Sequence, residues 1–269
     1  MAGSFHPEVA IPQAQLPKDR AMVKDAYTVI PKGVLKDTVT SNLPGWENTR
    51  SWIIARPIEG FATRFSQLIV EVGPGGGSRK PEPEAAVEGV LFLTRGWLTL
   101  ALDGELHILE EGSYAYIAAG AAWSLRNDSD GITNFHWIRK AYEPADGYTA
   151  TSFVTRDQDV EPSQMQGTNG SWATTRFVDP DDLAHDMHVN IVTFEPGTSI
   201  PFAGTPAMEH GLFVLEGNGV YLLNDDWVKV EAGDFMWLRA FCPQVCYAGG
   251  PGKFRYLLYT DANRQIRLT

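Results

Sequence analysis

Residues 88–112 read EGVLFLTRGWLTLALDGELHILEEG, and residues 209–233 read EHGLFVLEGNGVYLLNDDWVKVEAG. The two segments match at one fixed offset, both in their glycines and in the apolar residues between them. The matched positions are Glu88 with Glu209, Leu91-Phe92 with Leu212-Phe213, Gly96 with Gly217, Leu102 with Leu223, and Gly112 with Gly233. Because turn glycines fix the hairpin geometry on which the flanking strands depend, this recurrence indicates a duplicated β unit.

Short runs of alternating apolar and polar residues, separated by turn residues, continue around both segments. In the first block they cover 65–72, 89–94, 97–102, 106–109 and 114–118, and in the second 189–194, 212–215, 220–223, 228–230, 235–238 and 254–259. The composition agrees, since 26 glycines, 17 prolines and 11% aromatic residues favour short strands joined by tight turns. We therefore predict an all-β chain with two successive barrels.

The boundaries of the barrels follow from the same pattern. We predict a first barrel over residues 51–143 and a second barrel, which carries the pocket, over residues 181–269. Residues 144–180 between them are polar and rich in turn residues, which is typical of a linker. Residues 1–50 form an N-terminal segment that we expect to brace the two barrels. Its candidate edge strands are 26–30 and 38–40.

Charge and hydropathy exclude several classes of partner. The formal net charge is -11, so a nucleic-acid backbone or an anionic membrane surface would repel the chain. No apolar run approaches the roughly 20 residues that a membrane-spanning helix needs, and the first residues lack the order of a secretory signal. We therefore expect a cytoplasmic protein that binds a small-molecule substrate, with no nucleic acid and no membrane as partner.

The chain has only two cysteines, Cys242 and Cys246. Two cysteines with three residues between them provide no disulfide framework, and no close-set histidine completes a zinc-type cluster around them. We expect both to be buried, reduced thiols.

The second block carries the most specific motifs of the chain. They are Glu209-His210-Gly211-Leu212, Leu215-Glu216-Gly217, Val230-Glu231-Ala232-Gly233-Asp234, Pro243-Gln244 and Tyr256-Leu257-Leu258-Tyr259. With these motifs the chain resembles, over nearly its whole length, the bicupin (S)-ureidoglycine aminohydrolases, also called glyoxylate-induced proteins, of the cupin superfamily. The resemblance implies two tandem antiparallel β-barrels of the jelly-roll type. It is also compatible with a homo-oligomer, because such cupins associate through sheet edges.

The resemblance also implies an activity and a set of site residues. Enzymes of this family bind Mn²⁺ in the second barrel and hydrolytically release ammonia from ureidoglycine in purine catabolism. On this sequence the family's ligand positions are His210, Gln244, Gly204 and Pro206, of which only the first two carry a donor side chain. The resemblance further assigns catalytic roles to His210 and Gln244. It assigns substrate binding to Tyr221, Gln244, Tyr256 and Thr260, and Thr260 occupies the position of the family's carboxylate-binding lysine.

Gly204 and Pro206 change the chemistry of the predicted metal site. Mn²⁺ prefers several nitrogen and oxygen donors, and neither glycine nor proline has a side-chain donor. One imidazole and one carboxamide, without a carboxylate, should hold the ion weakly. Glu209 falls on the strand face opposite His210, so only a bulge near Pro206 would turn it inward. We therefore expect Mn²⁺ to be bound weakly or not at all.

Other candidate positions receive structural interpretations. The equivalents of the ligand positions in the first barrel are Pro83, Ala85, Gly89 and Trp123, which lack metal-binding groups. We expect a structural role for them, with Trp123 and its neighbours filling the barrel interior. In the second barrel, His185 and His188 fall on opposite faces of a strand. His188 and Asn190 share a face, which brings His188 next to His210 in one interpretation and leaves it as a core histidine in the other.

Three functional hypotheses remain open from the sequence. The first is a hydrolase of the ureidoglycine aminohydrolase type. The second is a divergent, metal-free cupin enzyme in which His210 serves as acid or base on a less polar small molecule. The third is a non-catalytic cupin that binds a metabolite.

Overall fold

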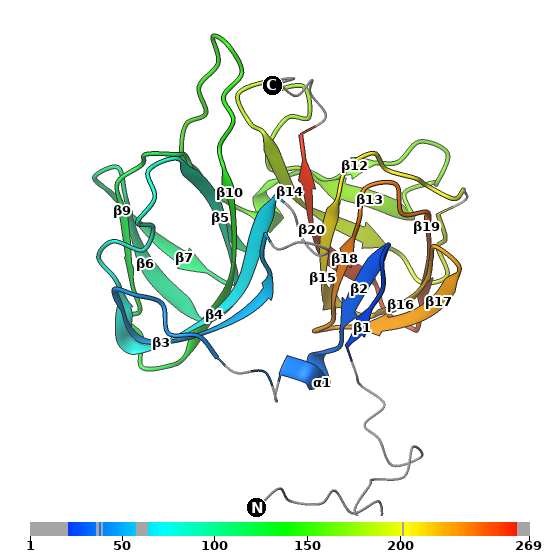
Figure 1. Cartoon of the computed structure of the whole chain (residues 1–269), viewed down its shortest axis with the longest axis horizontal. Coiled ribbons are helices and arrows are strands. Elements are labelled where there is room, and N and C mark those ends of the chain that lie inside the picture. Colours follow the sequence, from blue (N-terminus) through cyan, green and yellow to red (C-terminus); the bar gives the residue numbers. More distant parts are fainter. Residues whose placement is uncertain (1–20, 36–37, 39, 58–63, 201, 263–269) are drawn as a thin grey trace, which may run out of the picture.

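Two β-barrels lie side by side in the computed structural model, which describes residues 21–35, 38, 40–57, 64–200 and 202–262. All strand pairs between named strands are antiparallel, so the predicted all-β fold with two barrels is confirmed. Figure 1 shows the first barrel on the left, in cyan and green, and the second on the right, mainly in yellow and orange. None of the described helices is long and apolar enough to span a membrane.

One curled sheet of nine strands forms the first barrel. Its strands are β3 (Trp46–Ala55), β4 (Phe65–Ser78), β5 (Val87–Arg95), β6 (Trp97–Leu102), β7 (Glu105–Glu110), β8 (Ser113–Ile117), β9 (Trp123–Arg126), β10 (Thr133–Ala141) and β11 (Phe153–Arg156). The hairpin β6–β7 pairs Leu102 with Glu105, and the two residues between them, Asp103 and Gly104, both have positive φ. This is the turn chemistry that a tight hairpin requires, and the Asp-Gly pair predicted it.

Two sheets form the second barrel. The larger sheet contains β1 (Met22–Val23), β2 (Tyr27–Ile30), β12 (Ser163–Gln164), β13 (Trp172–Thr175), β14 (Met187–Phe194), β15 (His210–Glu216), β18 (Phe235–Leu238) and β20 (Phe254–Asp261). The smaller sheet contains β16 (Asn218–Leu223), β17 (Asp226–Glu231) and β19 (Gln244–Gly249). The duplicated motifs therefore occupy equivalent hairpins, β5–β6–β7 and β15–β16–β17.

The N-terminal segment contributes strands to both barrels. Strand β2 pairs with β18 of the second barrel, whereas β3 pairs with β4 of the first. The chain between them includes the short helix α1 (Lys32–Leu35). The candidate edge strand 38–40 includes Val39, which lies outside the described residues.

The region 144–180, which the sequence presents as a linker, also contains strands. Strand β11 pairs with β8 of the first barrel, and a 3-10 helix (Asp157–Asp159) follows it. Strands β12 and β13 extend the large sheet of the second barrel through the pairing of β13 with β14. The crossover between barrels is thus short, because each barrel takes part of this region into its own sheet.

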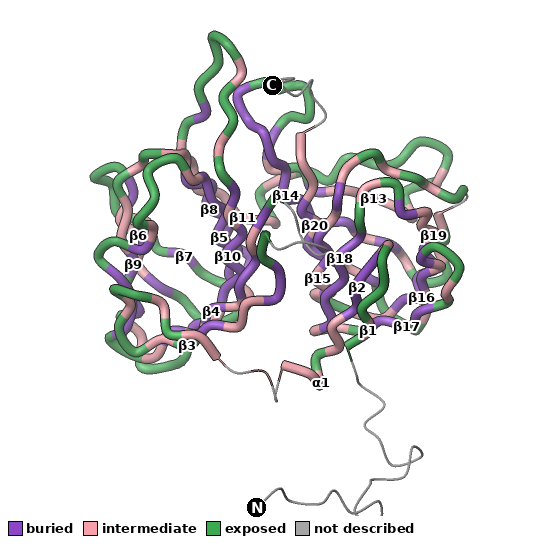
Figure 2. Tube along the Cα trace, in the orientation of Figure 1, coloured by how far each residue is buried: buried purple, intermediate pink, exposed green. Residues whose placement is uncertain are grey.

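Three apolar clusters hold the molecule together. Each barrel has an interior cluster, and a third cluster joins the barrels through residues such as Phe65, Tyr116 and Tyr259. Figure 2 shows buried segments where the facing strands of the two barrels meet. The strands at this boundary are therefore buried on both faces, with alternate residues directed into a barrel and into the interface.

Aromatic side chains fill the interior of the first barrel. The ring centroids of Trp46 and Trp123 lie 5.3 and 5.8 Å from that of Trp137. A Cβ atom at Gly89 would lie 3.2 Å from Nε1 of Trp137. Gly89 and Trp123 therefore pack in the first barrel, whereas Pro83 and Ala85 are exposed and do not fill it.

Candidate functional site

His210 begins strand β15 and is directed into the second barrel. Inward orientation follows from strand alternation, since Leu212 and Val214 on the same face pack in the barrel's interior cluster. Register pairs join His210 to Thr260 of β20, and Thr260 to His188 of β14. Residues opposite one another in antiparallel strands share a face, with Cβ atoms about 5 Å apart. His188, Thr260 and His210 therefore form one row across three strands.

Gln244 begins β19, on the sheet opposite this row, and reaches His210. Its Nε2 atom lies 3.3 Å from Nδ1 of His210. The carboxamide can donate to Nδ1 through nitrogen or, turned by a half rotation, accept from Nδ1–H through oxygen. Gln244 thus fixes the ring orientation of His210 and selects which ring nitrogen faces the interior. The structure brings together these two predicted site residues.

Gly204 lies beside Gln244, and Pro206 follows two residues later in the chain. Gly204 and Gln244 form an isolated antiparallel bridge, with N···O distances of 3.0 and 2.8 Å. The Pro206 carbonyl accepts a hydrogen bond of 2.7 Å from the amide of Phe241. A Cβ atom at Gly204 would have no neighbour closer than 3.9 Å. The backbone thus leaves room for a side chain at a position where this chain has none.

Tyr221 and Tyr256 lie deeper in the same barrel. Their ring centroids are 6.4 Å apart in an edge-to-face arrangement, and both side chains are buried in the interior cluster. Burial raises the pKa of both hydroxyls, so both phenols are neutral at ordinary pH. Cys246 is buried beside Tyr221, and Cys242 is also buried and free, as predicted.

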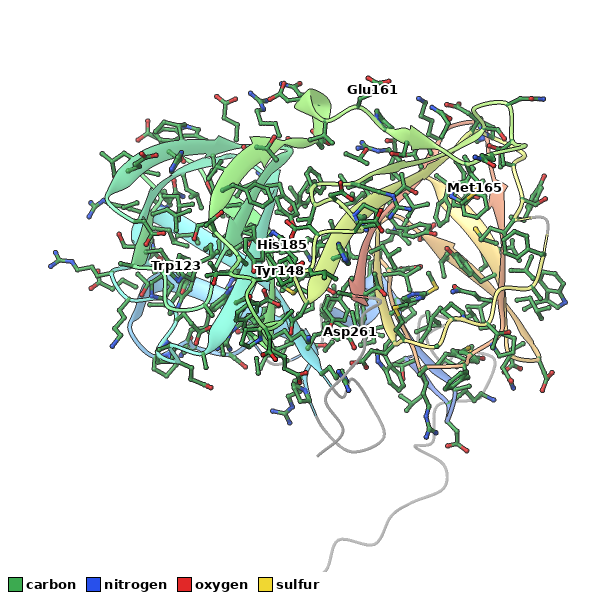
Figure 3. The ribbon with its side chains drawn as sticks, turned by 90° about the horizontal axis from the view of Figure 1, so that it is seen from above. Trp123, Tyr148, Glu161, Met165, His185 and Asp261 are labelled. Carbon is green, nitrogen blue, oxygen red and sulfur yellow. The ribbon has the colours of Figure 1, made fainter. Side chains whose placement is uncertain are left out.

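Burial determines the charge state of the histidines. It lowers the pKa of His210 to about 4, an effect that the negative charge of Asp261 partly opposes. Burial and the positive charges of His185 and Arg176 also lower the pKa of His188. Both imidazoles are therefore neutral at neutral pH. His185 has a different environment, because its ring contacts Tyr116 and Phe153 at the boundary between the barrels (Figure 3).

Glu209, adjacent to His210, faces away from the site. Its carboxylate accepts hydrogen bonds from the backbone N–H of Arg64 and from Nε1 of Trp237, at 2.8 and 3.0 Å. Both contacts lie on the interface side of the sheet, opposite His210. The orientation predicted from strand alternation is therefore observed, and no bulge turns this carboxylate inward.

The donor set does not fit Mn²⁺. His210 and Gln244 offer one imidazole and one carboxamide, both neutral, while a hard divalent ion prefers several oxygen ligands that include carboxylates. Across the described ranges, no three His, Cys, Asp or Glu side chains lie close enough together to hold a metal ion. Gly204 and Pro206, to which the resemblance assigns two further ligand positions, have no side-chain donor.

Met208 and Asp261 join the site without having been singled out from the sequence. The Thr260 hydroxyl donates to the sulfur of Met208 at 3.1 Å and to the carbonyl of Asp261 at 3.3 Å. Asn190 is two residues after His188 in strand β14 and lies on the same inner face, as the sequence predicted. The contacts of Met208 and Asp261 with Thr260 depend on the loop geometry, which the sequence pattern does not describe.

Two curated relatives match the chain over most of its length. The (S)-ureidoglycine aminohydrolase of Escherichia coli (strain K12) is 28% identical over 253 residues, covering 93% of this chain and 94% of that protein. The "probable (S)-ureidoglycine aminohydrolase" of Oryza sativa subsp. japonica is 33% identical over 227 residues, covering 84% of this chain and 71% of that protein. No protein-family model matches the chain.

Two solved structures superpose on both barrels of the chain. A glyoxylate-induced protein from Pseudomonas aeruginosa is 61% identical and superposes with a TM-score of 0.89, covering 94% of this chain and 95% of that one. A cupin 2 conserved barrel domain protein from Leptotrichia buccalis superposes with a TM-score of 0.58 at 16% identity, over 87% of this chain and 95% of that one. The second likeness concerns the fold alone, which is that of a cupin barrel.

Proposed function

Because the chain belongs to the (S)-ureidoglycine aminohydrolase family, we propose that it is a hydrolase that releases ammonia from a small, uncharged ureido compound without a tightly bound metal ion. The observation that carries this proposal is the pair His210–Gln244 on the inner face of the second barrel. The family relationship supplies the reaction class. The changed residues at 204, 206 and 260 supply the departure from the family's metal and from its anionic substrate.

In the proposed reaction His210 acts as a general base. The carboxamide of Gln244 presents its oxygen to Nδ1–H, which leaves the lone pair of Nε2 free for a water proton. As the water oxygen bonds to the amine-bearing carbon, the carbon–nitrogen bond breaks and the amine leaves. The proton held by His210 passes to the departing nitrogen, so that water and substrate give an alcohol and ammonia. Both Tyr221 and Tyr256 supply neutral hydroxyls deeper in the barrel.

Thr260 supports the choice of an uncharged substrate. A lysine at this position would present a positive charge to a carboxylate, whereas threonine offers only a hydroxyl. The neighbouring imidazoles of His188 and His210 are neutral, because burial lowers the pKa of each. A carboxylate in this row would lose hydration without gaining an ionic partner, so neutral ureides and amides fit better.

The substitution His210→Ala tests the proposal. We expect ammonia release from an uncharged ureide with an amine on the carbon beside the ureido nitrogen to fall by roughly 10²- to 10⁴-fold, the usual contribution of a general base. His107→Ala is the matched control, since His107 lies on β7 of the first barrel. Unchanged activity in His210→Ala would refute the general-base role. Saturable binding without ammonia release from any ureido acid or amide would instead identify a binding protein.

A further inference from the structure

Strand β7 is an edge strand of the first barrel. It pairs with β6 on one side, and no strand in the described part of the chain pairs with it on the other. The turn between β6 and β7 has two residues, so the flanking pair, Leu102 with Glu105, exchanges backbone hydrogen bonds. Since hydrogen-bonded and non-bonded pairs alternate from there, the N–H and C=O groups of Leu106 and Ile108 point away from β6.

The side chains at these two positions are apolar and exposed. Leu106 is 75% exposed and Ile108 is 60% exposed. Both lie on the outer face of the sheet, because Leu109, in the alternate set, is buried in the barrel. The N–H of Glu110 also points away from β6, but it donates to Oγ of Ser113 at 2.8 Å. The open edge therefore consists of Leu106 and Ile108, each with a backbone donor, a backbone acceptor and an apolar side chain.

The equivalent strand of the second barrel, β17, differs at the same two positions. Trp227 corresponds to Leu106, and Lys229 corresponds to Ile108. A lysine on an edge strand opposes pairing with another strand, because pairing would desolvate its charge. Strand β7 contains neither lysine nor proline, and its pairing with β6 shows no bulge. Of these two equivalent edges, that of the first barrel is the one open to another strand.

The open edge is complementary to itself in one antiparallel register. With Leu106 of each copy opposite Ile108 of the other, the outward N–H and C=O groups of both residues are all hydrogen-bonded. The apolar side chains then form two cross-strand pairs on one face. Glu105 and Glu110 lie opposite uncharged residues in this register. A shift by two residues in either direction leaves only one apolar pair.

We propose that the chain forms a symmetric dimer in which β7 of the first barrel pairs with β7 of a second copy, in the register that places Leu106 opposite Ile108. One continuous sheet then runs through both copies. The partner is the chain itself, because the same groups are satisfied on both sides of the two-fold axis. This interface goes beyond the proposed function, which concerns the second barrel, and it gives the first barrel a surface for association.

Sedimentation velocity of the full chain tests the dimer. We expect the wild-type protein to pass from monomer to dimer above about one micromolar, because an interface built on one strand pair is small. Leu106→Lys should raise the dimer Kd by about tenfold or more, since both copies then carry a charge on the paired edge. Trp227→Lys is the matched control. It adds the same charge at the equivalent position of β17, which is 69% exposed, and should leave the Kd unchanged.

Hydrogen exchange locates the pairing in the wild-type protein, without any substitution. The N–H groups of Leu106 and Ile108 are open in the monomer and hydrogen-bonded in the dimer. Their exchange should therefore slow as the protein concentration rises through the Kd. The N–H groups of Trp227 and Lys229 have the equivalent edge position on β17, and their exchange should not depend on concentration.

A wild-type protein that stays monomeric up to about one millimolar would overturn the inference and leave the edge to a strand of another protein. A dimer that Leu106→Lys leaves intact would also overturn it, as would concentration-dependent protection that falls on β17 and not on β7. Ammonia release by His210→Ala tests the proposed function separately, because His210 lies in the second barrel.

Discussion

The imidazole of His210 owes its neutral state to its position at the inner start of β15. Burial lowers its pKa to about 4, more than two units below the ordinary value for histidine, and the carboxylate of Asp261 offsets only part of this effect. A neutral imidazole is able to take a proton from water throughout the physiological range. Burial also lowers the pKa of His188, so the row of His188, Thr260 and His210 contains no charged side chain at neutral pH.

This pKa predicts the acid limb of the pH–rate profile. The base form of His210 is lost only as the pH falls through about 4, so kcat/KM for ammonia release should be constant from pH 8 down to about pH 5. The measurement is initial-rate ammonia release across this range, with circular dichroism to confirm folding at each pH. An acid limb near pH 6.5 would show that the essential histidine is a solvated one.

From the sequence we predict His210, Gln244, Tyr221, Tyr256 and Thr260 as site residues, through the resemblance to the family. The structure was needed to show which of these residues contact one another. The contact between Gln244 and His210 joins residues 34 apart in the chain, and the row through Thr260 depends on the register of three strands.

Among the elements, the glycine-containing turns between successive strands shape each barrel. Gly217 joins β15 to β16 with a φ of +76°, and a Cβ atom there would lie 2.1 Å from the carbonyl oxygen of Lys253. Gly104 joins β6 to β7 with a φ of +91°, and a Cβ atom there would meet nothing within 4 Å. The two glycines have similar backbone requirements but very different surroundings.

These surroundings predict different effects of alanine. Gly104→Ala should cost about 1–2 kcal/mol of unfolding free energy, the usual penalty for a left-handed alanine. Gly217→Ala should cost more than that, because the backbone of Lys253 must also move. Urea denaturation of both variants provides the comparison. Equal losses would contradict the close approach of the two backbone segments.

The repeated strands were predictable because alternation and turn residues are local signals. The strands with which the flanking segments pair were not predictable from the sequence. Strand β2 completes the second barrel by pairing with β18, more than 200 residues further along the chain. Strands β11, β12 and β13 lie in a region whose polar composition is typical of a linker. Their formation depends on the edges that the barrels offer, which no local pattern describes.

For the whole molecule, ionisable groups buried between the barrels determine how stability depends on pH. His136 of β10 is buried against Phe213 of the second barrel, with a ring-centroid distance of 4.1 Å. Lys140 forms a 2.7 Å ion pair with Asp186, and Glu88 lies in the same cluster. Burial, together with the charge of Asp186, raises the pKa of Glu88, so this carboxyl is protonated at neutral pH.

His136 predicts loss of stability in acid. Desolvation lowers its pKa to about 3 in the folded state, while an unfolded chain has the ordinary value near 6.5. Between these values the unfolded state binds more protons, so stability falls as the pH falls below 6.5, by up to about 2 kcal/mol at pH 5. Denaturant unfolding at pH 7 and pH 5 should show a smaller loss for His136→Gln than for the wild type. His107→Gln should keep the wild-type loss.

Glu88 predicts the opposite effect at alkaline pH. Its folded-state pKa is raised, so the folded state holds a proton that the unfolded state releases above its ordinary pKa. Stability should therefore decline as the pH rises through the folded-state pKa of Glu88. Glu88→Gln keeps a neutral polar group in place, and its unfolding free energy should vary less between pH 7 and pH 10 than that of the wild type. An unchanged dependence would place the alkaline transition elsewhere.

The central claim is that the second barrel retains the family's site geometry but works without a tightly bound metal ion. Titration calorimetry of Mn²⁺ into chelator-treated wild-type protein tests it most directly. With only His210 and Gln244 as donors, we expect no saturable binding below millimolar Mn²⁺. The double variant Gly204→Glu, Pro206→His is the positive control, since it restores a carboxylate and an imidazole beside Gln244. Stoichiometric, micromolar binding of Mn²⁺ by the wild-type protein would contradict the claim.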